Sequence, residues 1–154
     1  MKISDILSPE RTSCAAGPAS KKRALEEIAA LMLNADASLT QGEIFDSLLS
    51  RERLGSTGLG HGVAIPHGRV NSATATIGAF MQLRQGIDFD AIDGQPVDLI
   101  FGLLVPAEST EEHLQNLAQL AKMFSDEAFC EQLRHANNNE ELYDILTDWQ
   151  PATE

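Results

Sequence analysis

The sequence predicts an α/β protein, built as a single-domain sandwich with a mixed, mostly buried β-sheet that helices flank on both faces. Patterns typical of helices come before, between and after patterns typical of strands, as such sandwiches require. Residues 97–105 form a nearly continuous apolar run, which is expected of a central strand covered on both faces. The length of 154 residues fits one domain over residues 1–154.

Two helices are expected in the first third of the chain. Ser20 is a suitable cap for a helix over residues 20–34, in which apolar residues recur at helical spacing. Thr40 and Glu43 form a capping-box pair that opens a second helix, and Gly55 is a typical residue to end it.

Two further strands are expected before the central one. Residues 63–65 and 73–83 have the character of strands, and Asp93-Gly94 signals a turn before the apolar run. The order of the strands stays open. It also stays open whether residues 1–17 pack on the domain or form a loosely attached segment.

Three helices are expected in the last third of the chain. Ser109 and Glu112 form a second capping box, which opens a helix over residues 109–124. Shorter helices should follow over residues 126–135 and 140–148.

The formal net charge is −12, because 11 Lys and Arg stand against 23 Asp and Glu. A uniformly negative surface repels nucleic acids and anionic membranes, so a general role in binding either is disfavoured. The two cysteines show no CxxC spacing, the N-terminus has no signal-peptide pattern, and no apolar run is long enough to span a membrane. We therefore expect a cytoplasmic protein without membrane insertion.

Acids are absent from residues 53–87, a stretch of 35 residues. Buried strands exclude carboxylates, which accounts for residues 73–83. It does not account for residues 55–62, because a glycine-rich loop normally lies on the surface. The stretch and its border hold Arg51, Arg53, Arg69 and Arg84. The sequence therefore predicts a local anion site within an acidic protein.

Residues 55–62 are one part of this predicted site. Their four glycines allow backbone amides to approach an anion closely, and Ser56 and Thr57 add hydroxyl donors. The order of residues matches neither a nucleotide P-loop nor a dinucleotide-binding fingerprint. A nucleotide site of either kind is therefore not expected.

His67 is the candidate reactive residue. It follows Ile65-Pro66, and the restricted backbone around proline should place it at a defined point after the strand. Imidazole has an unprotonated nitrogen near neutral pH and can act as a nucleophile. A lone histidine after a strand more often has a structural role, but the glycines, hydroxyls and arginines nearby favour a functional one.

His113 and Arg51 are weaker candidates. His113 falls in the first turn of the helix opened by Ser109, where the positive helix end favours an anion. The alternative is a solvated helix residue, since Glu111 and Glu112 beside it are polar. Arg51 stands near a helix C-terminus, where it could simply complement the helix dipole.

Metal sites and hydrolytic chemistry are disfavoured. His61 and His67 have no Cys or carboxylate at ligand spacing, and Asp88, Asp90 and Asp93 lack the rest of a calcium loop. No activating base accompanies His67, which argues against a hydrolase or metalloenzyme. We expect no metal and no cofactor.

An ordered motif contains these residues: Glu52, six residues, Leu59-Gly60, two residues, and then Val63-Ala64-Ile65-Pro66-His67-Gly68. It resembles the signature of the type-2 (fructose/mannitol) IIA proteins of the phosphoenolpyruvate-dependent phosphotransferase system. The resemblance extends over nearly the whole chain. In residues 21–25, 89–93 and 103–107 the chain looks most like the nitrogen-regulatory members of that family.

The resemblance implies a mixed sheet with helices on both faces and a phosphoryl group carried on Nε2 of His67. It implies that an HPr-like phosphocarrier (NPr) supplies this group, and that His113 and Arg51 hold its oxygens. Ser56 and Thr57 match polar loop positions near the site. The role of His61 stays open.

The expected function is therefore that of a phosphocarrier and regulatory protein rather than a turnover enzyme. Its targets, by resemblance, include potassium-transport proteins and sensor kinases. No permease and no appended domain with a nucleophilic Cys accompanies it in this sequence, which favours regulation. The alternatives are a sugar-specific IIA component that passes the phosphoryl group to a IIB domain, and a binding module that has lost phosphorylation.

Overall fold

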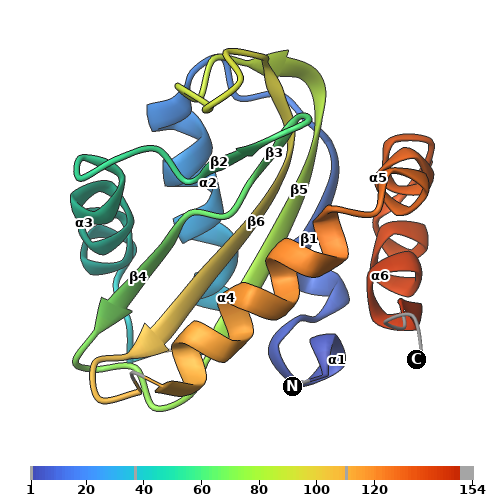
Figure 1. Ribbon diagram of the computed structural model, residues 1–154. Helices are drawn as coiled ribbons and strands as arrows, with labels where there is room; N and C mark the ends of the chain where they lie inside the picture. Colours follow the sequence, from blue (N-terminus) through green and yellow to red (C-terminus); the bar gives the residue numbers. More distant parts are fainter. Residues whose placement is uncertain (1, 37, 110, 150–154) are drawn as a thin grey trace.

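The computed structural model describes residues 2–36, 38–109 and 111–149, and its centre is a six-stranded mixed sheet (Figure 1). The strands run in the order β1-β5-β6-β3-β2, and β4 also pairs with β6. Their bounds are β1 Thr12–Ala16, β2 Gly58–Gly60, β3 Val63–Ala64, β4 His67–Val70, β5 Ile77–Ile87 and β6 Val97–Pro106.

β6 is the central strand that the sequence predicts. It pairs with β5 in antiparallel fashion on one side, and with β3 and β4 in parallel on the other. β1 runs parallel to β5, and β2 runs antiparallel to β3. Residues 99–105 of β6 are all buried, as expected for a strand covered on both faces.

β3 and β4 lie end to end along the same side of β6. Val63 pairs with Leu99 and His67 pairs with Leu103, so both strands keep the same register. Between them, the amide of Leu103 donates a hydrogen bond of 3.0 Å to the carbonyl oxygen of Pro66. The two strands are separate because the Ile65-Pro66 segment interrupts the ladder, and proline has no N–H to donate.

Two long helices cover one face of the sheet and three helices cover the other (Figure 1). The described helices include none that is long and apolar enough to cross a bilayer. On the first face lie α2 (Lys21–Met32) and α3 (Gln41–Glu52), and on the second α4 (Glu111–Phe124), α5 (Glu127–Arg134) and α6 (Asn139–Asp148). The short elements are α1 (Ile3–Ile6) and the 3₁₀ turns Pro9–Arg11 and Leu33–Ala35.

Each face has its own hydrophobic core, because successive side chains of a strand point to opposite faces. Met81 and Ile100 belong to the core under α2 and α3. Phe80 and Phe101 belong to the core under α4, α5 and α6. The ring of Phe80 stacks on that of Phe124 in α4, with centroids 6.1 Å apart. This arrangement confirms the predicted fold class.

The N-terminal segment, whose packing the sequence leaves open, is part of the domain. Ile3, Ile6 and Leu7 are buried in the second core, and α1 contacts α6. β1 then adds a parallel strand beside β5. The strand β1 is hard to predict from the sequence. Its residues do not alternate regularly between buried and exposed, as they would in a strand with one buried face.

The predicted helix caps are largely present. Oγ of Ser20 accepts a hydrogen bond from the amide of Arg23, and Thr40 and Glu43 form the reciprocal capping box. The second predicted capping box, of Ser109 and Glu112, spans Thr110, which lies outside the described residues. The helix itself, α4, begins at Glu111.

Two strand predictions need correction. The strand expected over residues 73–83 instead spans Ile77–Ile87, and Ala73 belongs to a turn in which its amide bonds the carbonyl of Val70. Residues 67–70, for which the sequence predicts no strand, form β4. Pairing with β6 makes this short segment a strand, and such pairing cannot be read from local composition.

Candidate functional site

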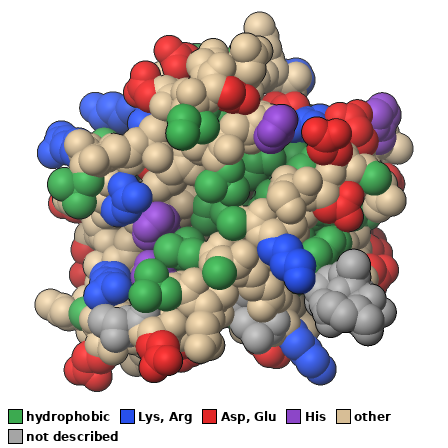
Figure 2. All heavy atoms as spheres, viewed as in Figure 1, with side chains coloured by type: hydrophobic (Ala, Val, Ile, Leu, Met, Phe, Trp, Pro, Cys, Tyr) green, Lys and Arg blue, Asp and Glu red, His purple; other side chains and the backbone are tan. Residues whose placement is uncertain are grey.

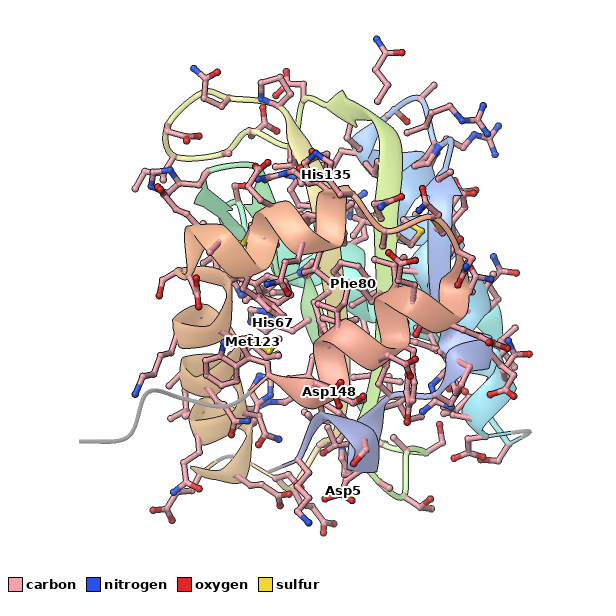
Figure 3. All side chains as sticks on the ribbon, turned by 90° about the vertical axis from the view of Figure 1, so that its right-hand side faces the viewer. Asp5, His67, Phe80, Met123, His135 and Asp148 are labelled. Carbon is pink, nitrogen blue, oxygen red and sulfur yellow. The ribbon has the colours of Figure 1, made fainter. Side chains whose placement is uncertain are left out.

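His67 lies in a pocket at the edge of the sheet, between α3 and α4 (Figure 3 labels His67). The pocket has a volume of about 380 Å³. On one side of the face in Figure 2, histidine, basic and hydrophobic side chains lie together. The lining residues are Ser47, Ser50, Arg51, Leu54, His67, Gly68, Arg69, His113, Leu114 and Leu117. Three predicted site residues, His67, His113 and Arg51, therefore meet here.

The close packing of α3 on β4 brings Arg51 to the pocket. A Cβ on Gly68 would overlap Oγ of Ser47 and lie 3.1 Å from its backbone carbonyl carbon, so a larger residue would push the helix away. Oγ of Ser47 also donates a hydrogen bond of 2.9 Å to the carbonyl oxygen of Arg69. Arg51 follows Ser47 by one helical turn and shares its face of α3.

The tautomer of His67 follows from its backbone contact. Nδ1 of His67 lies 2.9 Å from the carbonyl oxygen of Ile65. A carbonyl oxygen can only accept a hydrogen bond, so Nδ1 must carry the proton. In the neutral ring Nε2 is then the nitrogen with a free lone pair, and it is the ring atom that could act as a nucleophile.

The surroundings of His67 keep its ring neutral near pH 7. Burial lowers the pKa of His67 below its usual value of 6.5, and the guanidinium groups of Arg51 and Arg69 lower it further. The hydrogen bond to Ile65 and the carboxylate of Glu52 act in the opposite direction. The net effect favours the form that can attack an electrophile.

His113 is the immediate neighbour of His67. The two ring centroids are 5.3 Å apart, with an angle of 55° between the rings. His113 is only 4% exposed, and its Nδ1 has no hydrogen-bond partner within the described part of the chain. Burial, with the nearby His67 and Arg69, lowers the pKa of His113 to about 4. His113 is therefore a buried neutral imidazole, not the solvated helix residue of the alternative interpretation.

Arg51 and Arg69 provide the positive charge of the pocket. A terminal nitrogen of Arg51 donates a hydrogen bond of 2.9 Å to the carbonyl oxygen of Gly55, which fixes one edge of its guanidinium. Arg69 is exposed and lowers the pKa of both His67 and His113. An anion bound at Nε2 of His67 would meet both charges.

Arg69 is one of the arginines of the predicted anion site, but the sequence does not indicate that it lies beside His67. It stands two positions after His67, and on a strand such residues point to the same face. The spacing has this meaning only once residues 67–70 are known to form a strand, and the sequence predicts no strand there.

Ser56 and Thr57, predicted as phosphoryl-binding residues, do not line the pocket. Oγ of Ser56 donates a hydrogen bond of 2.7 Å to the carbonyl oxygen of Phe89. The amide and hydroxyl of Thr57 bond the carboxylate of Glu52 at 2.9 and 2.6 Å. Glu52 is buried and also pairs with Lys21 at 3.1 Å. The hydroxyl of Thr57 thus attaches the loop to the end of α3, and the hydroxyl of Ser56 attaches it to the segment before β6.

The glycine-rich stretch is a hairpin, not the predicted anion cradle. Gly58 and Gly60 belong to β2, which pairs with β3. A Cβ on Gly58 would lie 2.8 Å from that of Ala91, so close packing explains this glycine. His61 occupies the turn with a φ of 56°, is exposed and does not line the pocket.

The charge of the pocket agrees with the stretch of chain without acids. None of its described lining residues is an Asp or Glu. Within the described ranges, no group of three or more His, Cys, Asp or Glu side chains is arranged to hold a metal ion. The pocket thus combines two neutral imidazoles with two arginines, a set suited to binding and transferring an anionic group.

The fold and this pocket define a small α/β domain with a histidine placed for group transfer. Residues 5–149 match the family described as "Phosphoenolpyruvate-dependent sugar phosphotransferase system, EIIA 2". The chain belongs to this family, as the motif around His67 indicates.

Comparison with individual relatives supports this family assignment. A "Nitrogen regulatory protein" from Escherichia coli strain K12 is 47% identical over 149 residues, which cover 96% of this chain and 91% of that protein. The crystal structure of nitrogen regulatory protein IIA-Ntr from Neisseria meningitidis has a TM-score of 0.88 and 46% identity, covering 94% of this chain and 99% of that one. A fructose-specific EIIA component from Haloferax volcanii is 36% identical over 146 residues, 95% of each chain. The predicted likeness to the nitrogen-regulatory members is confirmed.

Proposed function

We propose that this chain is a phosphocarrier in which Nε2 of His67 accepts a phosphoryl group from the phosphohistidine of an HPr-like carrier (NPr). The observation that carries the proposal is the hydrogen bond between Nδ1 of His67 and the carbonyl of Ile65, because it leaves Nε2 free. The arginines of the pocket and membership in the EIIA family support it.

The transfer step needs no proton movement at His67. The lone pair of Nε2 attacks phosphorus, the N–P bond of the carrier breaks, and its electron pair returns to the imidazole of the carrier. His67 keeps the proton on Nδ1, so its ring gains a positive charge that the Ile65 carbonyl and the phosphoryl dianion offset. Such a transfer depends on positioning and on charge stabilisation.

The other pocket residues act on the phosphoryl oxygens. Arg51 and Arg69 offset their negative charge as the group arrives. A dianion next to His113 raises the pKa of this histidine, so that it gains a proton and donates a hydrogen bond to the group. The low pKa of His113 before transfer, about 4, keeps its ring neutral, so that Arg51 and Arg69 carry the positive charge that meets the arriving group.

Exposed apolar residues at the rim support docking of a protein donor. Leu54 is 85% exposed and Leu114 is 65% exposed, and both line the pocket that contains His67. Exposed apolar side chains beside charged ones are typical of a protein interface. The donor would therefore cover the pocket and exclude water while the group moves.

We further propose that the phosphorylation state of His67 regulates target proteins, of which potassium-transport proteins and sensor kinases are candidates. The similarity to proteins named nitrogen regulatory supports this assignment. The similarity to a fructose-specific EIIA component favours the alternative, in which the group passes to a IIB domain for sugar uptake.

Reconstituted phosphorylation tests the proposal. The protein is incubated with phosphoenolpyruvate, the first enzyme of the system and the HPr-like carrier, and intact mass is measured at alkaline pH. Wild type should gain one phosphoryl group and His67→Ala none. His135→Ala is the matched control, because His135 is exposed and does not line the pocket. A wild type that gains no phosphoryl group would overturn the carrier proposal in favour of a pure binding module.

A second measurement distinguishes the regulatory protein from the sugar-specific IIA component. The phosphorylated protein is mixed with a fructose- or mannitol-type IIB domain, and loss of its phosphoryl group is followed over time. Retention of the group is expected of the regulatory protein. Rapid transfer to the IIB domain would overturn the regulatory proposal and establish the sugar-specific alternative.

A further inference from the structure

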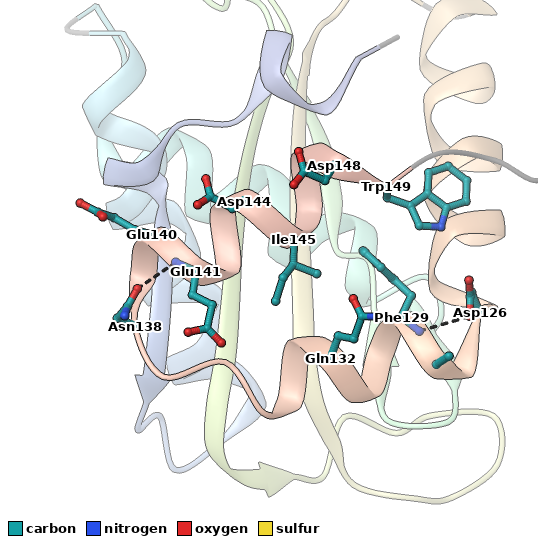
Figure 4. A pocket seen from close by; sticks show the side chains of 11 residues that line it. Asp126, Phe129, Gln132, Asn138, Glu140, Glu141, Asp144, Ile145, Asp148 and Trp149 are labelled. Atoms are coloured by element: carbon teal, nitrogen blue, oxygen red, sulfur yellow. Dashed lines mark hydrogen bonds between the residues drawn. The ribbon is translucent and has the colours of Figure 1, made fainter.

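A second and larger pocket lies between α5 and α6, away from α3 and the His67 pocket (Figures 1 and 4). Its volume is about 520 Å³. It shares no lining residue with the pocket around His67, so the proposed phosphoryl transfer does not explain it. We call it the α5–α6 groove.

The floor of the α5–α6 groove is apolar. Figure 4 shows Ile145 and Phe129 pointing into the space between the two helices. Trp149 closes one end, with its ring centroid 6.3 Å from that of Phe129. Ile145 and Trp149 are only half-buried, so the groove offers apolar surface that a ligand could cover.

The rim of the α5–α6 groove is strongly acidic. Residues 126–148 hold seven of the 23 acids of the chain and only one of its 11 Lys and Arg. That one, Arg134, already pairs with Asp98 and Glu131 and does not line the groove. The acids that line it are Asp126, Glu140, Glu141, Asp144 and Asp148.

Most of these rim acids have no counter-charge. Asp126 caps α5 by accepting a hydrogen bond from the amide of Phe129. Glu140, Glu141, Asp144 and Asp148 form no ion pair with any residue that the structure describes. Glu140 and Glu141 lie in the first turn of α6, whose positive end partly offsets their charge, whereas Asp144 and Asp148 lie beyond that turn. The rim acids around the apolar floor create a negative potential that a cationic ligand would neutralise.

We propose that the α5–α6 groove docks a basic segment of a partner protein, in which Lys or Arg residues flank an apolar side chain. The apolar residue covers Ile145 and Trp149, and the basic residues meet the rim acids. A second copy of this chain is a poor occupant because it carries the same net charge of −12. Residues 150–154 are also poor occupants, since they contain no Lys or Arg and end in a glutamate.

This docking site is independent of the chemistry at His67. A partner held at α5 and α6 leaves the His67 pocket open to the phosphoryl donor. The α5–α6 groove would therefore retain a target protein in either phosphorylation state, which a regulator needs if the state is to change while the target is bound.

Tryptophan fluorescence measures occupation of the groove directly, because Trp149 is the only tryptophan of the chain. The probe is a synthetic peptide in which arginines alternate with leucines. It should change the emission of Trp149, and its affinity should fall as salt rises, because salt screens the rim charges. An analogue with glutamate in place of arginine should have no effect. An unchanged emission with the arginine peptide would overturn the proposal.

Charge-reversal variants test whether binding is local. The affinity of the fluorescein-labelled arginine peptide should fall about tenfold or more in Asp144→Lys/Asp148→Lys. Glu27→Lys/Asp46→Lys is the matched control, because it replaces two exposed helical acids on the other face and changes the net charge equally. Equal weakening in both variants would mean nonspecific attraction to an acidic protein and would contradict a built site.

Amide chemical shifts complete the test. Shift changes caused by the arginine peptide should fall on α5 and α6, in wild type and equally in His67→Ala. Changes centred on the His67 pocket would contradict the proposal. Because His67→Ala cannot carry the phosphoryl group, failure of the phosphocarrier proposal would leave this result unaffected.

Discussion

Nδ1 of His67 lies 2.9 Å from the carbonyl oxygen of Ile65, two residues earlier in the chain. Ile65 and Pro66 lie between β3 and β4, so the Ile65 carbonyl belongs to neither strand and meets the ring. This backbone contact determines the tautomer of His67 and leaves Nε2 as the nitrogen with a free lone pair.

Arg69 should influence both histidines of the pocket. Its guanidinium lowers the pKa of His67 and of His113, so Arg69→Gln should raise both values. Histidine ring signals followed by NMR across a pH titration measure the change. Arg84→Gln, on β5 and outside the pocket, is the control and should leave both titrations unchanged. Unchanged titrations in Arg69→Gln would show that this arginine does not face the site.

His113 should make the folded state sensitive to acid. Its pKa is about 4 in the folded protein and about 6.5 when unfolded, so between these values only the unfolded state binds the proton. Stability is therefore lost as the pH falls from 6.5 to 4. The loss attributable to His113 is at most about 3 kcal/mol.

The variant His113→Gln isolates this contribution. Urea unfolding of wild type and variant is measured at several pH values between 6.5 and 4. Carboxylates titrate in both proteins, so the difference between their free energies of unfolding reports on His113 alone. Wild type should lose stability relative to the variant toward pH 4. A difference that stays constant over this window would contradict a buried neutral His113.

Leu54 and Leu114 should affect the protein donor but not the chemistry. Replacing both exposed leucines with glutamine should raise the KM for the phosphorylated carrier about tenfold or more, because apolar contacts at the interface are lost. Phosphorylation by phosphoramidate, a small donor that needs no docking, should proceed at the wild-type rate. Ile92→Gln is the matched control, since Ile92 is 87% exposed and lies outside the pocket. A loss with phosphoramidate as well would place the leucines in the reactive site itself.

Thr57 should matter for stability and not for transfer. Thr57→Val removes the hydroxyl that bonds the buried carboxylate of Glu52, which should cost about 1–3 kcal/mol of unfolding free energy. The rate of phosphorylation of the folded variant should stay within about twofold of wild type, because removal of an oxyanion donor would slow the reaction far more. A much slower transfer with unchanged stability would return Thr57 to the phosphoryl site.

Much of the fold could be predicted because local signals and tertiary structure agree. Ser20 and the Thr40–Glu43 pair open their helices as expected, and the apolar run 97–105 becomes the central strand β6. The short strands were missed for a physical reason. β1 and β4 are strands through pairing with β5 and β6, and neither segment has a periodicity of its own that indicates it.

The site could be predicted in part. His67 was identified by its position after proline within an acid-free stretch, and the structure brings His113 and Arg51 to it from two other elements. The sequence places Arg69 only among the arginines of the acid-free stretch, because its alignment with His67 depends on β4. Ser56 and Thr57 were assigned to the site because loop hydroxyls are common anion donors, but buried Glu52 and the Phe89 carbonyl use these groups. Only the three-dimensional arrangement reveals such competition.

The most direct test is the position of the phosphoryl group on the imidazole. Wild-type protein labelled with ¹⁵N on histidine is phosphorylated by the HPr-like carrier, and the phosphorus–nitrogen couplings are measured at alkaline pH. We predict a phosphoryl group on Nε2 of His67, with Nδ1 still facing Ile65. Phosphorylation of Nδ1, of His113, or of no histidine would contradict it.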